Sequence, residues 1–326
     1  MKITNYSYKP GLNMYKRIKN ISVAVCLMTF FLGFSNKLTA QYYFYNDSYY
    51  DTPLMFELGA TVGAMNSLTD IGGKKGIGGK YFKDLNIGNT EFTAGLYFGA
   101  MYKSMVGLRL EANFGKVSAY DSVLAGVKDI AIARYNRNLS FRSNILEVAL
   151  IAEFHPLFAF IDWTAKDYDP PRFSPYIMAG IGYFKFNPQA KLNNTWVDLQ
   201  PLSTEGQGFA EFPDRKPYEL SSLSIPLGAG VKYELSPMIN LRAEFLYRAT
   251  NTDYLDDVST KYIDESIYAN YFAGAKLNNA LLLHDRQLGQ DYRQTLPGKK
   301  RGNEKDNDNY FSFNLKVGLA IGRQRR

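Results

Sequence analysis

Apolar and polar residues alternate one by one in several stretches of this chain, most clearly in GLRLEANFGK, from Gly107 to Lys116. Here Leu108 and Leu110 alternate with Arg109 and Glu111. A period of two places successive side chains on opposite faces of a β-strand. The pattern therefore predicts a sheet with one apolar face and one charged face.

Eight such segments occur, and each has about the 9–11 residues that a tilted transmembrane strand needs, or slightly more. After the first 40 residues no apolar run approaches the ~20 residues of a membrane-spanning helix. The expected strands are Met55–Met65, Glu91–Tyr102, Met105–Lys116, Ser140–Phe154, Ser174–Phe186, Leu223–Leu235, Ile239–Ala249 and Tyr310–Gly322.

The links between these segments alternate between short and long, which is typical of outer-membrane barrels with short periplasmic turns and longer extracellular loops. Only KS separates the second and third segments and SPM the sixth and seventh, while a longer link follows the fourth. The long links span 66–90, 117–139, 187–222 and 250–309. We therefore expect an all-β fold, an eight-stranded antiparallel transmembrane outer-membrane β-barrel over residues 55–322. A soluble β-sandwich is the alternative.

The first 40 residues predict a secretory signal peptide. A basic region that includes Arg17 precedes the apolar run Ile21–Phe34, and the segment ends at Ala40. This run is short for a transmembrane helix, so an N-terminal membrane anchor is the less favoured alternative. Residues 41–54 are then expected to form a periplasmic N-terminal segment and residues 323–326 a basic periplasmic tail.

Removal of the signal peptide changes the charge balance of the chain. The segment holds six of the 38 basic residues and no acidic residue, which leaves 32 basic against 31 acidic residues. It also contains the only cysteine, Cys26. A nearly neutral mature chain gives no electrostatic argument for nucleic-acid binding. The 25 Tyr and 22 Phe residues of the full sequence, most of which lie after the signal peptide, suit a membrane barrel.

In a membrane barrel the apolar face of each strand contacts lipid and the charged face lines the lumen. An eight-stranded barrel is narrow enough for side chains to fill its interior, and buried charges need partners. We therefore predict a network of paired charges that fills the lumen, with an open pore as the alternative. Its expected members are Arg109, Glu111, Glu147, Lys185, Lys232, Arg242, Glu244, Arg248 and Lys316.

Residues suited to catalysis are sparse. His155 and His284 lie far apart in the sequence, with no serine and acid arranged around either. A membrane hydrolase would need the fold to bring these groups together. We therefore predict no catalytic residue and no cofactor. Pro226 lies inside the sixth segment, where it removes a ladder donor, and is expected at the strand's outer rim or at a bulge.

The acidic run TDYLDDVSTKYIDE could bring Asp253, Asp256 and Asp257 around a Ca²⁺ ion. The run lacks the spacing and the glycine of an EF-hand loop. These short side chains are instead expected to bind loop backbone, so no metal site is predicted. Farther on, PGKKRGNEKDNDN is charged and without apolar residues, which predicts disorder.

Four runs carry a family resemblance: RYNRNLSFRSNILEVAL, SPYIMAGIGYFKFNP, SIPLGAGVKYELS and TDYLDDVST. They resemble a family of Bacteroidota outer-membrane β-barrels that includes PorG, a component of the type IX secretion system. The resemblance extends from about Phe56 to the C-terminus. It implies a non-catalytic integral protein that anchors or stabilises a periplasmic ring of the PorK and PorN type, in protein transport and, in some species, gliding motility.

The link after the fourth segment would offer such a partner a periplasmic surface, because exposed aromatic side chains beside charges are typical of interfaces. The candidate contacts are Phe158, Phe160, Trp163, Asp167, Tyr168 and Asp169. An aromatic belt at the membrane surface is the alternative for the two phenylalanines. Apart from outer-membrane lipid, no small-molecule or nucleic-acid partner is expected. A small structural or adhesive barrel and a narrow porin remain the alternative functions.

Overall fold

The computed structural model describes residues 53–72, 87–126, 131–160, 171–288 and 295–321. All of them belong to the compact unit from Asp47 to Arg326. The expected signal peptide and the expected basic tail lie outside the described residues. Within the described ranges, no helix is long and apolar enough to cross a membrane.

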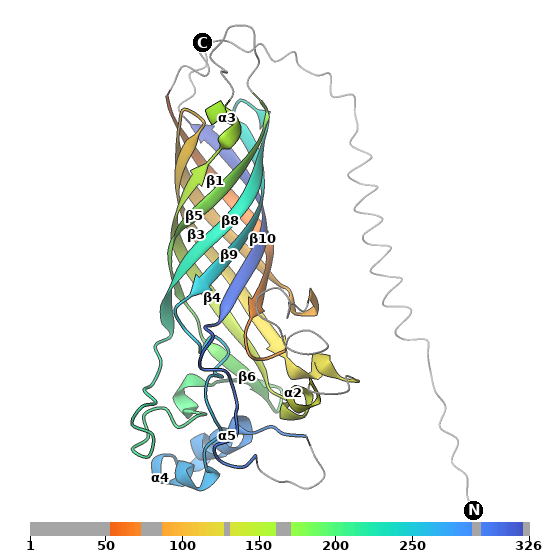
Figure 1. Cartoon of the computed structure of the whole chain (residues 1–326), viewed down its shortest axis with the longest axis vertical. Helices are drawn as coiled ribbons and strands as arrows, with labels where there is room; N and C mark the ends of the chain where they lie inside the picture. Colours follow the sequence, from red (N-terminus) through yellow and green to blue (C-terminus); the bar gives the residue numbers. More distant parts are fainter. Residues whose placement is uncertain (1–52, 73–86, 127–130, 161–170, 289–294, 322–326) are drawn as a thin grey trace, which may run out of the picture. The chain divides into compact units, whose positions relative to one another are not determined.

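Eight antiparallel strands pair in a closed ring (Figure 1). The order around the ring is β1, β2, β3, β4, β5, β8, β9 and β10, and β10 pairs again with β1. Their bounds are β1 (Leu54–Leu68), β2 (Glu91–Tyr102), β3 (Val106–Tyr120), β4 (Ser140–Phe154), β5 (Phe173–Lys185), β8 (Ser221–Ser236), β9 (Ile239–Thr250) and β10 (Asn309–Ile321). The predicted fold class, a closed eight-stranded antiparallel barrel, is confirmed.

The two ends of the barrel differ, and we name them the turn end and the loop end (Figure 1). The turn end carries the β2–β3 and β8–β9 turns and the short helix α3 (Pro156–Phe160). The loop end carries the four long connections. Their elements are η3 (Ile87–Asn89), η4 (Asp121–Leu124), α2 (Ala131–Arg137), β6 (Pro188–Leu192), β7 (Thr195–Asp198), η5 (Gln200–Leu202), η6 (Glu265–Ile267), α4 (Tyr268–Tyr271) and α5 (Gly274–His284).

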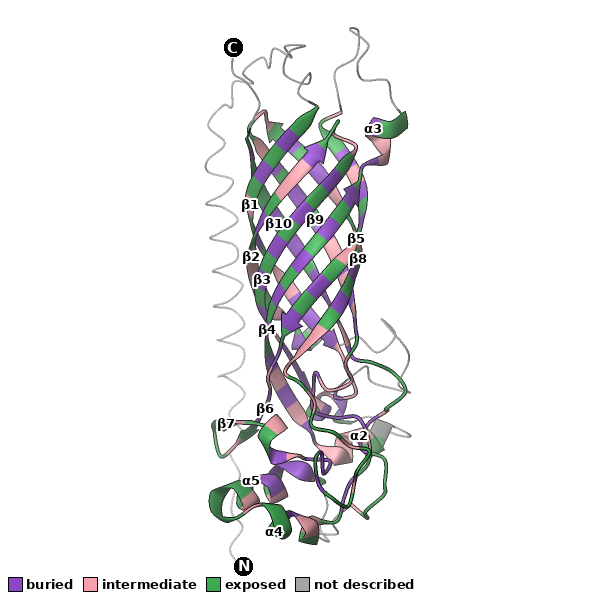
Figure 2. Cartoon of the chain, turned by 90° about the vertical axis from the view of Figure 1, so that its left-hand side faces the viewer, coloured by how far each residue is buried: buried purple, intermediate pink, exposed green. Residues whose placement is uncertain are grey.

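Buried residues alternate with exposed or half-buried residues over most of the barrel wall (Figure 2). In β3, the exposed fraction is 53% for Leu108 and 52% for Leu110, against 2% for Arg109 and 0% for Glu111. The outer wall is therefore apolar and the lumen is charged. This is the reverse of a soluble sheet protein, and it is the arrangement that the period of two predicts for a barrel in lipid.

All eight predicted strands are present, and most ends fall within two residues of the expected ones, but two strands extend three or four residues farther. β1 and β3 continue to Leu68 and Tyr120, into ranges that were expected to be loops. β3 stays paired with β4 as far as Tyr120, opposite Ser140, and its Val117 is fully buried. The barrel wall therefore extends past the apolar outer band, because inward-facing side chains still pack there. The expected loop 187–222 likewise contains the β6–β7 hairpin.

Pro226 lies inside β8, at neither the rim nor the bulge that the sequence suggested. It stays in register opposite Arg248 of β9, whereas the irregularity in the β8–β9 pairing falls between Glu234 and Ser236. On the other side, the β5–β8 pairing is interrupted between Leu227 and Ser224. A proline cannot donate to a sheet ladder, so the barrel accommodates Pro226 by a local gap in one ladder.

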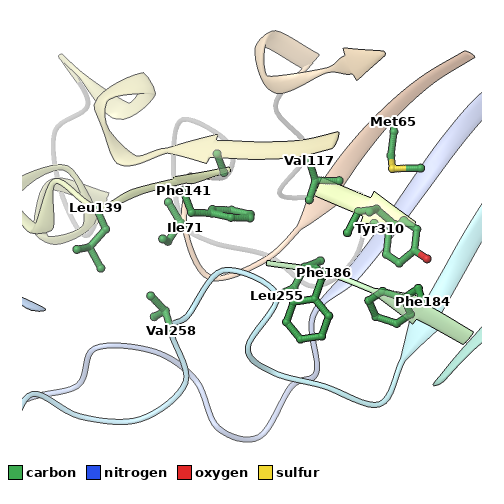
Figure 3. Packing of buried hydrophobic residues seen from close by; sticks show 12 residues of the cluster. Met65, Ile71, Val117, Leu139, Phe141, Phe184, Phe186, Leu255, Val258 and Tyr310 are labelled. Atoms are coloured by element: carbon green, nitrogen blue, oxygen red, sulfur yellow. The ribbon is translucent and has the colours of Figure 1, made fainter. Parts of the chain in front are cut away.

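An apolar cluster closes the lumen at the loop end (Figure 3). Strand residues such as Phe141 and Phe184 meet loop residues such as Leu255 and Val258. Tyr310 belongs to the same cluster, and its ring lies edge-on to Phe184 at a centroid distance of 5.4 Å. The barrel and its long connections therefore share one core at this end.

Candidate functional site

Arg109 is at the centre of the charges inside the barrel. Its Nη1 lies 2.9 Å from Glu244 Oε1 and also contacts Glu153, and its Nε lies 2.5 Å from Glu111 Oε1. Lys316 contacts Glu111 and lies 2.9 Å from Glu244 Oε2. These residues come from β3, β4, β9 and β10, so the ion pairs cross the lumen rather than follow one strand.

Toward the turn end, Arg242 joins two carboxylates. Its Nε lies 2.8 Å from Glu57 Oε1, and its Nη1 lies 2.9 Å from Glu153 Oε2. Tyr97 donates to Glu57 Oε1 at 2.6 Å, and Asn240 donates to Glu57 Oε2 at 2.5 Å. Glu57 and Arg242 are thus both paired and hydrogen-bonded, which offsets the cost of removing their charges from water.

Toward the loop end, Arg248 pairs with Glu147, with 3.1 Å between Nη2 and Oε2. Tyr310 donates to Glu147 Oε1 at 2.9 Å, and Ser224 donates to the same oxygen at 3.2 Å. The apolar cluster lies directly beyond this pair, because Tyr310 belongs to both. The lumen is therefore filled by ion pairs over most of its length and by apolar side chains at the loop end.

The structure places eight of the nine predicted lumen residues inside the barrel, each at most 5% exposed. Seven of them form the ion pairs described above. Lys232 is equally buried but forms no ion pair with any described residue. The eight are Arg109, Glu111, Glu147, Lys232, Arg242, Glu244, Arg248 and Lys316.

The prediction for Lys185 was wrong, because this side chain is exposed on the outer wall. Lys185 shares its face of β5 with Ile181 and Tyr183, which are also exposed, while Phe184 and Phe186 point inward. At the loop end the inward positions of β5 are apolar and the outward position is charged. The reversal follows from the apolar cluster that closes the lumen there.

Several residues of the network were not among the predicted members. Glu57 and Glu153 occupy inward positions of β1 and β4. Tyr97 and Tyr176 are both 2% exposed and donate to Glu57 and Glu244. The alternation of each strand was the signal available for the two glutamates. The two tyrosines could not be predicted in this way, because an aromatic residue in a barrel strand suggests contact with lipid rather than a hydroxyl group that points into the lumen.

His155 is not isolated, contrary to the expectation from sequence. Its Nδ1 lies 2.8 Å from Ser174 Oγ and its Nε2 lies 3.3 Å from Glu153 Oε2, and its ring stacks on Tyr176. A serine, a histidine and an acid are thus adjacent, as in hydrolases. However, Ser174 and His155 are fully buried, and Glu153 already pairs with two arginines. In this arrangement the carboxylate is engaged by arginines, and both the serine and the histidine are shielded from solvent.

The structure describes only part of the predicted partner contact. Phe158 and Phe160 lie on α3, where Phe158 is 8% exposed and Phe160 is 84% exposed. Phe158 therefore packs against the barrel end, and Phe160 is presented to the surroundings. The other four candidates, Trp163, Asp167, Tyr168 and Asp169, lie outside the described residues.

The four long connections form a shared structure that we call the loop cap, comprising the described residues of 69–90, 121–139, 186–220 and 251–308. Arg137 pairs with Asp121 at 2.8 Å and donates to the carbonyl oxygens of Asp70 and Arg301. Arg301 in turn lies 3.0 Å from Glu205 Oε1. Arg137 and Arg301 thus link all four long connections to one another. Arg301 is only 3% exposed.

The prediction of disorder for the run PGKKRGNEKDNDN was wrong. Arg301 is buried in the loop cap, and Asp308 accepts from the backbone N–H of Leu255 at 2.9 Å. Lys300 pairs with Lys261 in an isolated antiparallel bridge. The composition of this run predicts disorder because it has no apolar residues, but its partners lie far from it in the sequence, at Leu255 in the same connection and at Glu205 in another.

Of the three aspartates in the acidic run at the start of the β9–β10 connection, Asp256 binds loop backbone, as expected. Asp256 accepts from the N–H groups of Val258 and Ile71 at 2.9 and 3.0 Å. Neither oxygen of Asp253 accepts a hydrogen bond of standard geometry from a described residue. Burial raises the pKa of Asp253 to about 8, and burial together with Asp70 raises the pKa of Asp256 to about 8.

Asp257 has both hydroxyl and guanidinium partners. Thr204 donates to its Oδ2 at 2.5 Å and Tyr218 donates to its Oδ1 at 2.7 Å. Burial raises the pKa of Asp257 to about 6, although Arg301 opposes the shift. No three histidine, cysteine or acidic side chains in the part of the chain that the structure describes are arranged to hold a metal ion.

A closed eight-stranded barrel with an apolar outer wall and a lumen filled with charge defines this chain as a β-barrel of the transmembrane, outer-membrane type. Within that class, the chain belongs to the family described as "Domain of unknown function (DUF6089)", which matches residues 48–280. No curated protein matches the chain significantly.

Among solved structures, the chain is similar to Neisserial surface protein A (NspA), with 9% identity over 81% of this chain and 96% of that chain and a TM-score of 0.34. It is also similar to Ail of Yersinia pestis, with 11% identity, coverage of 82% and 97%, and a TM-score of 0.32. A major outer membrane protein from Thermus thermophilus gives 11% identity, coverage of 82% and 99%, and a TM-score of 0.36. The assignment of this chain as a barrel rests on its own strand pairing and not on these similarities.

Proposed function

We propose that this protein is an outer-membrane β-barrel of the type IX secretion system, and that it anchors or stabilises a periplasmic ring of the PorK and PorN type. The observation that carries the proposal is the filled lumen. Ion pairs from four strands meet at Arg109, and an apolar cluster closes the loop end. A barrel filled in this way cannot conduct a folded protein, so a role as a membrane anchor suits it better.

The turn end supplies the surface for a partner in this proposal. Phe160 on α3 is 84% exposed, and large exposed aromatic side chains are common interface anchors. The resemblance of runs such as RNLSFRS and TDYLDDVS to PorG-type barrels supports this choice of partner. We place the turn end and both chain ends in the periplasm, because outer-membrane barrels carry their short turns there.

Chemical crosslinking in native membranes, followed by purification of the tagged barrel, tests the proposal. Ring proteins of the PorK and PorN type are expected to copurify with the wild type. We expect their yield to fall at least severalfold in Phe160→Ala, whereas Leu296→Ala, an exposed apolar residue of the loop cap, serves as the matched control. Recovery of the barrel alone at normal abundance would contradict the secretion role.

Orientation requires a separate measurement. Single cysteines at Ser104 in the β2–β3 turn and at Ser266 in the loop cap report on the two ends, because Cys26 is the only natural cysteine. A membrane-impermeant maleimide applied to intact cells should label position 266 and leave position 104 unlabelled. The reverse pattern would contradict the proposed orientation.

The ordered loop cap favours a second candidate function, binding of an external partner through the outer surface. Arg137 and Arg301 hold the four connections together, so the cap can present a fixed surface. In this case partners recovered by crosslinking would depend on Leu296 rather than Phe160.

A further inference from the structure

The outward-facing basic residues of the barrel strands are confined to one sector of the wall. In the eight barrel strands, which the structure describes completely, they are Lys116 on β3, Arg142 on β4 and Lys185 on β5. These three strands are neighbours in the ring. The remaining lysines and arginines of the barrel strands are buried in the lumen.

All three residues lie just beyond the apolar band at the loop end. Lys116 and Lys185 follow the exposed Phe114 and Tyr183 by two positions on the same face. Each lysine lies on the same outward face as the aromatic residue before it. The change from an apolar to a basic side chain therefore marks the level where lipid chains give way to headgroups. Three cations near the loop-end edge of the apolar band in one sector would therefore meet the headgroups of that leaflet.

The strand register places the three cations around one point on β4. Lys116 lies opposite Asn144, and Lys185 lies opposite Leu146. Arg142 is two positions beyond Asn144 on the same face of β4. From strand spacing and rise, the three Cα atoms lie within roughly 14 Å of one another. Long basic side chains can converge over that distance on one headgroup with more than one phosphate oxygen.

Arg142 is held in place with its binding groups unused. Its Nε donates to Gln189 Oε1 at 2.9 Å, and its guanidinium lies 3.8 Å from the centre of the Trp196 ring. Its two terminal NH₂ groups donate to no described residue. A planar guanidinium fixed in this way can bind two oxygens of a phosphate.

The acidic residues that face this sector do not neutralise it. Glu91 pairs with Lys116 at 3.1 Å, and the amide groups of Asn187 and Gln189 donate to Asp198. Lys185 forms no ion pair with any residue that the structure describes. The sector therefore retains one lysine without an ion pair, Lys185, and the two unused NH₂ groups of Arg142.

We propose that Lys116, Arg142 and Lys185 form a binding site for the phosphate of a lipid headgroup in the leaflet at the loop end. The site rests on the proposed insertion of the barrel into a membrane, but not on the ring partners. Phosphate accepts hydrogen bonds from both lysine and arginine, and a lipid is the form in which it occurs at this level of the wall.

Reconstitution of the full protein into phosphatidylcholine vesicles that contain phosphatidic acid tests the site. Spin-labelled phosphatidic acid and spin-labelled phosphatidylcholine report which lipid contacts the barrel. We expect the wild type to prefer phosphatidic acid, and the preference to fall by about fivefold in Lys185→Gln and in Arg142→Gln. Lys185→Arg should retain the preference, and Lys103→Gln at the turn end is the matched control.

Each outcome of this experiment bears on the proposal. Equal lipid preference in the wild type, Lys185→Gln and Arg142→Gln would overturn the site. Complete loss of the preference on addition of inorganic phosphate would assign the site to free phosphate and overturn the headgroup assignment. Heat-modifiable migration of each variant shows whether the barrel has folded. Failure to recover ring proteins would leave this result unchanged, since the vesicles contain none.

Discussion

At the scale of single residues, the lumen shows how a narrow barrel accommodates charge. Glu147 and Arg248 are 0% and 1% exposed and satisfy each other through a direct pair. Removing one partner of a buried pair leaves the other without compensation, which costs far more than the net value of the pair. The pair of Lys116 and Glu91 is half-exposed, and ion pairs open to water contribute little to stability.

Glu147→Gln should therefore lower the free energy of unfolding by about 3–5 kcal/mol. The reason is that Arg248 remains buried in the lumen without its carboxylate. Urea denaturation in detergent micelles measures the change. The matched control is Glu91→Gln, for which about 1 kcal/mol or less is expected. Similar small losses in both variants would contradict a lumen sealed from water.

The loop cap should make stability depend on pH. Burial raises the pKa of Asp253 and of Asp256 to about 8 from an ordinary value of 3.8. The folded state then binds more protons than the unfolded state between about pH 4 and 8, so stability falls as pH rises through this window. Burial lowers the pKa of His284 to about 4, which opposes the trend, but only below its ordinary value of 6.5.

Between pH 6.5 and 8 the aspartates therefore act without opposition from His284. We expect the urea midpoint to fall across this range in the wild type and to fall less in Asp253→Asn, because that variant removes one of the buried groups that titrate there. Asp264→Asn, at an exposed cap position, should retain the slope of the wild type. An unchanged slope in Asp253→Asn would contradict the assignment.

At the scale of elements, strand prediction succeeded where one rule applies along a whole strand. A period of two sets β4 from Ser140 to Phe154, and the structure has these ends. The rule was misapplied at Lys185, where charge was assumed to indicate the lumen although Tyr183 shares the same face. The loop cap could not be predicted from the sequence, because Arg137 and Arg301 bind partners in connections that are far apart in the sequence.

The β2–β3 turn offers a test at the same scale. Lys103 and Ser104 have φ angles of 50° and 56°, in the left-handed region where two-residue hairpin turns favour glycine. Ser104→Gly should raise the free energy of unfolding by about 0.5–1 kcal/mol, because relief of strain exceeds the added entropy of the unfolded chain. Ser222→Gly, inside β8, should instead be destabilising. A loss of stability in both would contradict the argument.

At the scale of the whole molecule, buried side chains occupy the barrel along its axis. Ion pairs centred on Arg109 and Arg242 fill the turn side, the pair of Arg248 and Glu147 follows, and apolar side chains complete the seal. The sequence predicted this filled lumen because strand count and inward charges suffice for it. The seal by loop residues such as Leu255 could not be predicted, since it depends on how the connections fold back.

The wild type should therefore pass no ion current in a planar lipid bilayer. The physical reason is that buried side chains, rather than water, occupy the lumen. Insertion is checked beforehand by heat-modifiable migration of protein recovered from the same vesicles. Regular single-channel current steps from inserted protein would support the narrow porin and contradict the proposed anchor.

The distribution of lumen charge along the chain also bears on how the barrel closes. The first five barrel strands bury four carboxylates, Glu57, Glu111, Glu147 and Glu153, against Arg109 alone. The last three strands bury four cations and two carboxylates: Lys232, Arg242, Arg248, Lys316, Glu234 and Glu244. A half-assembled sheet would thus be acidic along its inner surface, and the arriving strands would be basic. Attraction between the halves would favour the registers in which β10 pairs with β1 and the opposite charges meet.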